Sequence, residues 1–228
     1  MRMRRKKNLA TRNQNCKSIV LSRSTNIYQK KEEDRYELVD YSALFKNDNP
    51  VYLEIGCGKG RFVIEMAKNN KNANYIGVEL LENVIISAGE KADSEKVENV
   101  RFFNVGAEIL HYFLPKNSVS GIYLNFSCPY PKKQYANHRL THERFLTVYK
   151  KFLKPNSFIK MKTDSDGLFE FSLNSLEENG FKIIDKTDDL HANAPLDNIM
   201  TEYEEKFVKE NKKIHALTAV WEQKSEEL

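Results

Sequence analysis

The sequence predicts a doubly wound α/β domain. Short apolar runs of the kind that form buried strands alternate with amphipathic helical stretches, and a glycine-rich loop follows the first strand after a strong breaker cluster. The 228 residues fit one large domain, or one domain with an arm. No apolar run approaches the roughly 18 residues of a membrane-spanning helix, so we expect no membrane partner.

The predicted elements follow one another in a regular order. The strands are short runs rich in β-branched and aromatic residues, at 51–55, 75–78, 100–105, 121–126, 158–161, 181–184 and 214–221. The helices show apolar positions at helical spacing, at 61–68, 83–95, 109–114, 141–153 and 168–179. Pro155 follows the fourth helix and Gly180 ends the fifth. This alternation predicts a parallel sheet with helices on both faces.

The charge is distributed unevenly along the chain. The net charge is +4, but Met1 to Lys31 hold ten basic residues and no acid, so the other 197 residues carry −6. We expect a basic arm and lead-in at 1–46, mostly loop with a short helix, and one domain at 47–228 that begins at the cluster Asn47 to Pro50. Such an arm either contacts phosphate or is a solvated tail. Its longest apolar stretch, Ile19 to Leu21, is too short for a secretory signal.

The three cysteines, Cys16, Cys57 and Cys128, are far apart in the sequence and form no CxxC pair. A disulfide framework or a zinc site is therefore not expected, and a reducing cytoplasm is. The five histidines likewise show no spacing typical of metal ligands. We expect no metal.

The loop after the first predicted strand has glycines at alternate positions: Gly56, Gly58 and Gly60. Glycines allow a tight turn and the close approach of a bulky ligand. Glu79 ends the next strand, where a carboxylate can accept hydrogen bonds from both ribose hydroxyls. These features suit NAD and S-adenosylmethionine equally. The G-x-G-x-G spacing and the acid Glu54 favour S-adenosylmethionine, whereas Lys59 could meet a phosphate. A simple tight turn is the alternative.

A stiff loop follows the fourth predicted strand, with the sequence Ser127-Cys128-Pro129-Tyr130-Pro131-Lys132-Lys133. Many base-modifying methyltransferases place a polar-proline-aromatic segment here, against the flat face of a base. Lys132 and Lys133 then lie where nucleic-acid phosphate would run. A rigid loop that only ends the strand is the alternative.

Four further motifs are specific enough to indicate a family: Tyr123 to Ser127, Pro129 to Lys133 with Arg139-Leu140-Thr141, Lys162-Thr163-Asp164, and Asn198 to Glu204. In these motifs, and from its first residues to Trp221, the chain resembles the bacterial tRNA (guanine-N7-)-methyltransferases. The resemblance implies a class I, Rossmann-like methyltransferase with about seven strands. It implies a cytoplasmic enzyme, monomer or homodimer, that transfers a methyl group from S-adenosylmethionine to N7 of guanine 46 in the tRNA variable loop.

The resemblance also implies roles for individual residues. The cofactor contacts would be Glu54, Gly56, Gly58, Gly60 and Glu79, with the positions of Gly106 and Cys128. The tRNA contacts would be Lys132, Asp164, Thr201, Glu202, Tyr203 and Glu204. The chain departs from the family at two of these positions. Cys128 replaces an aspartate that is commonly assigned the catalytic role, and Gly106 replaces an acid that contacts the cofactor. The catalytic residue is therefore open, with Asp164 as one candidate.

The loss of that aspartate leaves several functions open. Guanine N7 has an in-plane lone pair and no proton, so it can attack a methyl sulfonium without a base, and positioning can supply most of the rate. Asp164 or Glu202 could then accept hydrogen bonds from the Watson–Crick edge of the guanine. The alternatives are a pyrimidine C5 methyltransferase with Cys128 as nucleophile, an adenine amino methyltransferase, and a tRNA-binding protein without turnover.

Overall fold

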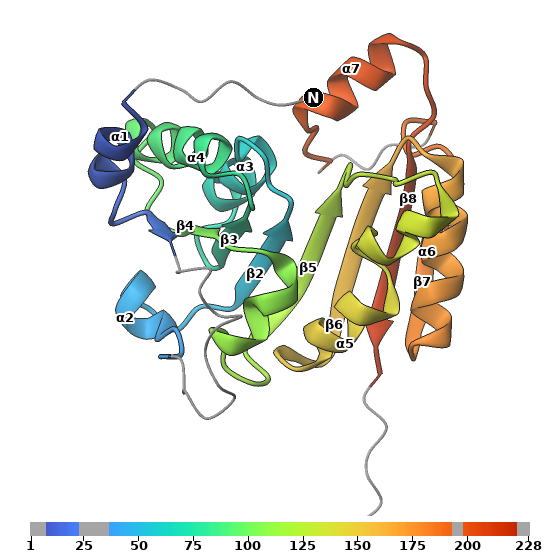
Figure 1. Ribbon diagram of the computed structural model, residues 1–228, viewed down its shortest axis with the longest axis horizontal. Coiled ribbons are helices and arrows are strands. Elements are labelled where there is room, and N and C mark those ends of the chain that lie inside the picture. The colour runs from blue at the N-terminus through green and yellow to red at the C-terminus, as the bar shows by residue number, and fades with distance from the viewer. Residues whose placement is uncertain (1–7, 23–36, 193–197, 223–228) are drawn as a thin grey trace, which may run out of the picture. The chain divides into compact units, whose positions relative to one another are not determined.

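The computed structural model describes residues 8–22, 37–192 and 198–222. The chain divides into two compact units, Met1–Gly106 and Ala107–Leu228, and each holds four of the described strands (Figure 1). Eight strands are therefore described where about seven were predicted. In the described ranges no helix is both long enough and apolar enough to span a bilayer.

The four strands of the first unit are all parallel. They are β1 (Val20–Ser22), β2 (Val51–Ile55), β3 (Asn74–Val78) and β4 (Val100–Asn104). Their spatial order is β1-β4-β3-β2, with each pair in parallel register. Every residue of β3 is buried, as expected for a central parallel strand with both faces covered. The carboxyl ends of β2 and β3 are therefore neighbours.

The helices of the first unit are α1 (Leu9–Asn15), α2 (Tyr41–Phe45), α3 (Arg61–Asn69) and α4 (Glu82–Ser94). Helix α3 packs on β3, and α4 packs on β4 and β1 (Figure 1). Ile64 of α3, Ile85 of α4 and Phe102 of β4 meet in one buried apolar cluster. A Cβ atom at Gly60 would lie 2.8 Å from the Cβ of Ala88, so this glycine permits the close approach of α4.

Part of the basic arm is folded onto the first unit. Helix α1 matches the predicted short helix, but β1 was predicted as loop because three residues are too few for a strand pattern. Cys16 and Val20 are buried in the core cluster, and Arg12 forms an ion pair with Glu90 of α4. Residues 1–7 and 23–36 of the predicted arm and lead-in lie outside the described residues.

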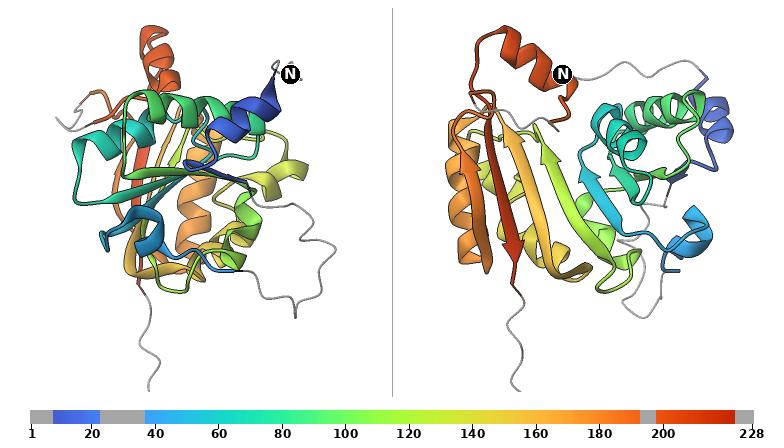
Figure 2. Two further views of the ribbon diagram at one scale, coloured as in Figure 1. Left: turned by 90° about the vertical axis from the view of Figure 1, so that its left-hand side faces the viewer. Right: turned by 180° about the vertical axis from the view of Figure 1, so that it is seen from behind.

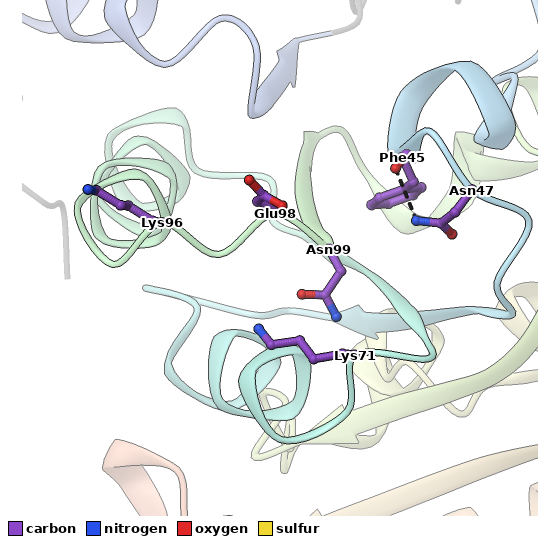
Figure 3. Close-up of a pocket in the computed structure, with 6 residues that line it drawn as sticks. All are labelled: Phe45, Asn47, Lys71, Lys96, Glu98 and Asn99. Atoms are coloured by element: carbon purple, nitrogen blue, oxygen red, sulfur yellow. Dashed lines mark hydrogen bonds between the residues drawn. The ribbon is translucent and has the colours of Figure 1, made fainter.

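The first unit also has a pocket of about 270 Å³ at the amino ends of its strands (Figure 3). Its lining consists of Phe45, Asn47, Lys71, Lys96, Glu98 and Asn99. Lys71 precedes β3 and Asn99 precedes β4, so the pocket lies at the edge opposite the glycine loop. It is not the predicted cofactor site.

The strands of the second unit form a mixed sheet. They are β5 (Val119–Asn125), β6 (Leu153–Thr163), β7 (Phe181–Thr187) and β8 (His215–Trp221), in the order β5-β6-β8-β7 (Figure 2). Strand β8 is antiparallel to β6 and to β7. The prediction of an entirely parallel sheet was wrong here, because β8 returns beside β7 without the crossover that a parallel pair requires.

The helical segments of the second unit are η2 (Ala107–Tyr112), η3 (Lys133–His138), α5 (Glu143–Lys150), α6 (Asp166–Glu178) and α7 (Glu202–Lys209). The helix predicted at 109–114 is the 3₁₀ segment η2. The helix predicted to reach Leu153 ends at Lys150, because Leu153 already pairs with Val119 in the sheet. The apolar stripe continues past the helix because Phe152 and Leu153 are themselves core residues.

Candidate functional site

The glycine loop lies between the carboxyl end of β2 and the start of α3, as predicted. Gly56, Gly58 and Gly60 have φ values of 81°, 55° and 78°, a region that favours glycine. The amides of Gly56 and Cys57 donate to the Val78 carbonyl at 2.8 and 3.0 Å, which holds the loop against the end of β3. The three glycines are therefore required by the turn itself.

Glu79 contacts this loop directly. One carboxylate oxygen accepts from the Gly58 amide at 3.2 Å and the other accepts from the Leu81 amide at 2.9 Å. A Cβ atom at Gly58 would have no atom within 4 Å, so the loop borders open space at this point. Each carboxylate oxygen keeps a lone pair for a further donor. Loop and acid thus fit a ligand that carries ribose hydroxyls.

Glu54 is the second acid of this edge and is only 3% exposed. Its charge and that of Glu79 raise the pKa of the Cys57 thiol, after the larger effect of burial. The thiol therefore stays neutral, whereas the two carboxylates concentrate negative charge around the glycine loop. Such a field favours a sulfonium or an ammonium group and disfavours a pyrophosphate.

The chain beyond Glu79 and beyond β4 completes this edge. The side-chain amide of Asn104 donates to the backbone carbonyls of Glu79 and Leu80 at 2.9 and 3.0 Å and so fixes the backbone after β3. Leu80 and Leu81 are exposed and offer an apolar surface beside the Glu79 carboxylate. Gly106, two residues after Asn104, is buried and carries no side chain with which to contact a ligand.

In the second unit, the segment after β5 is held by Arg139. Its guanidinium donates to the carbonyls of Pro129 and Tyr130 at 3.1 and 3.0 Å. Cys128 is exposed within this segment. Burial and then the neighbouring Cys128 raise the pKa of the Tyr130 hydroxyl, so it stays a neutral donor. Lys132 lies exposed just before η3.

Asp164 follows the end of β6 and forms an ion pair with Lys212, which comes after the carboxyl end of α7. The Lys212 ammonium lies 3.6 Å from its carboxylate and 4.4 Å from the centre of the Phe207 ring. The Asp164 side chain keeps about a quarter of its surface exposed, so it remains accessible to a donor.

The four residues Thr201 to Glu204 divide into two pairs. Thr201 and Glu204 are buried and form a capping box at the start of α7, in which the Thr201 hydroxyl accepts from the Glu204 amide at 3.0 Å. Glu202 and Tyr203 are exposed. The capping box of Thr201 and Glu204 therefore fixes the first turn of α7, from which Glu202 and Tyr203 reach the surface.

Glu204 is also the centre of a polar network that sequence reasoning missed. Its carboxylate is 0% exposed and accepts from the Lys162 ammonium at 3.1 Å and the Asn198 amide at 2.8 Å. His191 Nε2 lies 3.0 Å from the same carboxylate. The spacing Thr-x-x-Glu is a sequence signal for the cap, but nothing in the sequence indicates the partners in β6 and after β7.

Tyr203 points outward, which the sequence left open. Its ring is 60% exposed and lies 6.5 Å from the Phe126 ring and 6.2 Å from the Phe207 ring, at angles of 26° and 30°. Phe126 has a φ of 50°, a conformation that is unfavourable for a bulky side chain. Its amide donates to the Lys162 carbonyl at 2.8 Å, which maintains this conformation.

Within each unit, some predicted residues come together and others do not. In the first unit Gly58 contacts Glu79, and both acids influence Cys57. In the second unit Thr201 and Glu204 contact each other. Lys132 is exposed just before η3. Within the described part of the chain, no group of three or more His, Cys, Asp or Glu side chains could hold a metal ion.

Comparisons with known proteins show which family this chain is similar to. Residues 48–217 match the model of a family described as "Putative methyltransferase". The tRNA (guanine-N(7)-)-methyltransferase of Lysinibacillus sphaericus is 46% identical over 179 residues, which are 78% of this chain and 83% of that protein. The enzyme of the same name from Clostridium kluyveri is 46% identical over 163 residues, 72% of this chain and 77% of that protein.

Solved structures show the same fold at low sequence identity. The 16S rRNA methyltransferase KamB gives a TM-score of 0.62 at 15% identity and covers 82% of this chain and 96% of its own. A SAM-dependent methyltransferase from Aquifex aeolicus gives 0.54 at 15% identity, with 86% and 97% covered. These likenesses confirm the predicted class I, Rossmann-like fold. With relatives this similar over most of its length, the chain belongs to the tRNA (guanine-N(7)-)-methyltransferase family.

Proposed function

We propose that this protein transfers a methyl group from S-adenosylmethionine to N7 of a guanine in tRNA, at position 46 of the variable loop. The observation that carries the proposal is the 46% identity to the tRNA (guanine-N(7)-)-methyltransferase of Lysinibacillus sphaericus over 78% of the chain. The acid-lined glycine loop of the first unit supports it independently, since its chemistry suits a sulfonium cofactor.

The residues of the first unit hold the cofactor in this proposal. Glu79 binds the ribose hydroxyls with the lone pairs that Gly58 and Leu81 leave available. Glu54 attracts the positive end of the cofactor, and Gly58 leaves room for it beside the backbone. When bound, S-adenosylmethionine supplies an electrophilic methyl group on a sulfonium.

The substitution at N7 needs orientation rather than a proton acceptor. N7 carries a lone pair in the plane of the ring and no hydrogen, so no general base is required for the attack. Cys128 at the position of the family's aspartate is therefore compatible with turnover. The thiol is exposed beside the Tyr130 hydroxyl, and we assign it no role as a nucleophile.

Residues of the second unit orient the guanine. Asp164 and Glu202 are the carboxylates able to accept from its N1–H and exocyclic amine, and the outward ring of Tyr203 offers a stacking face. Lys132 is exposed and suited to a phosphate. Thr201 and Glu204 act through the helix cap, because both are buried in it.

The decisive experiment uses labelled S-adenosylmethionine and tRNA that lacks modifications, followed by nucleoside analysis. We expect 7-methylguanosine, and we expect none when guanine 46 is replaced by adenine. Methylated cytosine or adenine without 7-methylguanosine would contradict the proposal. A protein that binds tRNA but gives no heat with S-adenosylmethionine in calorimetry would be a non-catalytic binding protein.

The same proposal implies a cellular compartment and an oligomeric state for the enzyme. We place it in the cytoplasm, where its tRNA substrate is found and where its three free cysteines stay reduced. We propose that it acts as a monomer or a homodimer, which sedimentation of the full chain distinguishes.

A further inference from the structure

The turn that follows β7 places a histidine against the start of α7. Two successive side-chain bonds build this turn: the Asp189 amide donates to the Thr187 hydroxyl at 3.2 Å, and the His191 amide donates to the Asp189 carboxylate at 3.2 Å. The amide of the buried Leu190 donates to the carbonyl of Ile214, the residue before β8, at 2.7 Å. The backbone that carries His191 is therefore anchored to the end of β7 and to the chain that enters β8.

The His191 ring reaches the buried carboxylate of Glu204. Its Nε2 atom lies 3.0 Å from Oε1 of Glu204. Because a carboxylate that is paired with an ammonium only accepts hydrogen bonds, this nitrogen carries the hydrogen. The His191 side chain is 23% exposed and that of Glu204 is 0% exposed, so water competes little for the contact. Removal of the donor would leave a buried charged oxygen with one partner fewer.

The Glu204 carboxylate uses its acceptor sites inside the protein. Among the described residues, His191 and the Asn198 side chain donate to Oε1, while the Lys162 ammonium and the Thr201 amide donate to Oε2. A carboxylate has about four lone-pair sites for such bonds. Glu204 thus joins the end of β6, the turn after β7 and the segment before α7 to the first turn of α7.

The first turn of α7 also carries a side chain that reaches the surface. Figure 1 shows α7 beyond the carboxyl ends of β5 and β6. Tyr203, one residue before Glu204, is 60% exposed, and its ring stacks with those of Phe126 and Phe207. Both Tyr203 and Glu204 lie in the same helical turn, so a displacement of the Glu204 backbone would move the tyrosine with it.

We propose that His191 is a positioning residue for the methylation: through Glu204 it fixes the turn of α7 from which Tyr203 contacts the guanine. This inference rests on the proposed function, in which the Tyr203 ring stacks on the target base. Attack of N7 on the methyl group requires the nitrogen, the carbon and the sulfur to be aligned, so a small displacement of the base slows the reaction. His191 itself touches neither the base nor the cofactor in this proposal.

The test replaces His191 by two amides of different reach in the full chain. Glutamine places a side-chain N–H near the position of Nε2, whereas the shorter asparagine ends near the position of Nδ1. We expect kcat at saturating tRNA to fall about 10- to 100-fold in His191→Asn and to stay within about threefold of the parent in His191→Gln. KM for tRNA should change less than kcat, because phosphate contacts supply most of the affinity for nucleic acid. His111→Asn is the matched control with the parent's kcat, since His111 is a partly buried histidine of η2 in the same unit.

Hydrogen exchange distinguishes this inference from the proposed function. We expect the Thr201 and Glu204 amides to exchange faster in His191→Asn than in the parent and in His191→Gln, because both amides are bonded within the capping box. Amides of β6 give the reference for overall stability. Equal kcat values of the two His191 variants would overturn the inference, as would exchange that is unchanged at α7 or accelerated equally in β6. If the parent makes no 7-methylguanosine, the proposed function fails, and the exchange rates alone decide whether His191 fixes α7.

Discussion

The Gly58 amide donates a hydrogen bond of 3.2 Å to the Glu79 carboxylate, so the acid that ends β3 is anchored to the loop that follows β2. A second bond to the Leu81 amide holds the other oxygen. The carboxylate is therefore oriented before any ligand arrives, which reduces the entropy lost on binding.

Replacement of Glu79 should weaken the binding of the methyl donor. Glu79→Ala removes two charge-assisted acceptors for ribose hydroxyls, and we expect a loss of roughly 2–4 kcal/mol in calorimetry with S-adenosylmethionine. The affinity for tRNA should change little. Glu98→Ala is the matched control, since Glu98 is an exposed acid at the opposite edge of the same unit. Equal donor affinities of the two variants would show that the cofactor site is misplaced.

Loss of the Glu204 carboxylate should destabilise the second unit. Glu204 is 0% exposed and its partner Lys162 is only 15% exposed, so Glu204→Ala removes a largely buried ion pair. We expect the free energy of unfolding in urea to fall by about 3–5 kcal/mol. Glu202→Ala, an exposed change in the same helical turn, should stay within about 0.5 kcal/mol. Similar stabilities of the two variants would mean that the network contributes nothing.

The first unit could be predicted well from the sequence because its signals are local. Strands 51–55, 75–78 and 100–105 are short runs rich in β-branched and aromatic residues, and they match β2, β3 and β4 within one residue at each end. Parallel neighbours bring their carboxyl ends to the same edge, so the sequence also predicts that the glycine loop and Glu79 are close. Their hydrogen bond agrees with that expectation.

The second unit shows where local patterns stop being informative. Strand β8 is antiparallel to β6 and β7, and this direction depends on the path of the chain after β7. The spacing of apolar residues within a strand does not predict its direction. Lys162 and Glu204 are 42 positions apart, so their ion pair depends on the tertiary fold. Strand β1 is only three residues long. Its extended conformation is stabilised by pairing with β4, which its own sequence does not indicate.

Charges at the start of the chain should contribute to tRNA binding. Deletion of residues 1–31 would also remove β1 and the buried Cys16 and Val20, so weaker binding could reflect unfolding. Replacement of Arg2, Arg4, Arg5, Lys6 and Lys7 by serine changes no residue of β1 or of the core cluster. We expect the salt slope of tRNA binding to fall by up to about 0.9 for each phosphate that these side chains neutralise in the parent. Unchanged slope and affinity would identify this end as a solvated tail.

Tyr149 carries a polar group that the fold does not use. The residue is fully buried, and its hydroxyl has no hydrogen-bond partner among the described residues. Tyr149→Phe should therefore leave the free energy of unfolding unchanged or raise it by about 1 kcal/mol. Tyr75→Phe is the control, because the buried Tyr75 hydroxyl is hydrogen-bonded to Asn70 and its loss should cost about 0.5–1.5 kcal/mol. A larger loss for Tyr149→Phe than for Tyr75→Phe would contradict this interpretation.

Tyr149 should also affect how the free energy of unfolding changes at alkaline pH. Burial raises the pKa of the Tyr149 hydroxyl above its usual value, so the unfolded chain releases this proton at lower pH than the folded one. Below about pH 10 both states keep the proton and the shift has no effect on stability, whereas above it the unfolded chain is favoured because it releases the proton more readily. The parent should thus lose stability more steeply than Tyr149→Phe in urea unfolding between about pH 9.5 and 11. Parallel curves would contradict the shift.

Cys128 should be dispensable for turnover. Methylation at N7 proceeds without a base, and a small side chain between Ser127 and Pro129 can pack beside the guanine without being deprotonated. We expect Cys128→Ala to retain kcat within roughly tenfold, about 1.4 kcal/mol of barrier. Ser127→Ala, one residue away, controls for disturbance of the loop.

Cys128→Asp tests the opposite change at the same position. A carboxylate there could accept from the Watson–Crick edge of the guanine and raise turnover, provided that Asp164 or Glu202 does not already fill that place. Two results would overturn the interpretation of Cys128 as a passive residue. One is a covalent protein–RNA adduct with fluoropyrimidine-containing tRNA. The other is loss of turnover in Cys128→Ala while S-adenosylmethionine and tRNA still bind with the parent's affinities. Either result would make pyrimidine C5 methylation the leading hypothesis, because that chemistry requires a thiolate attack on C6.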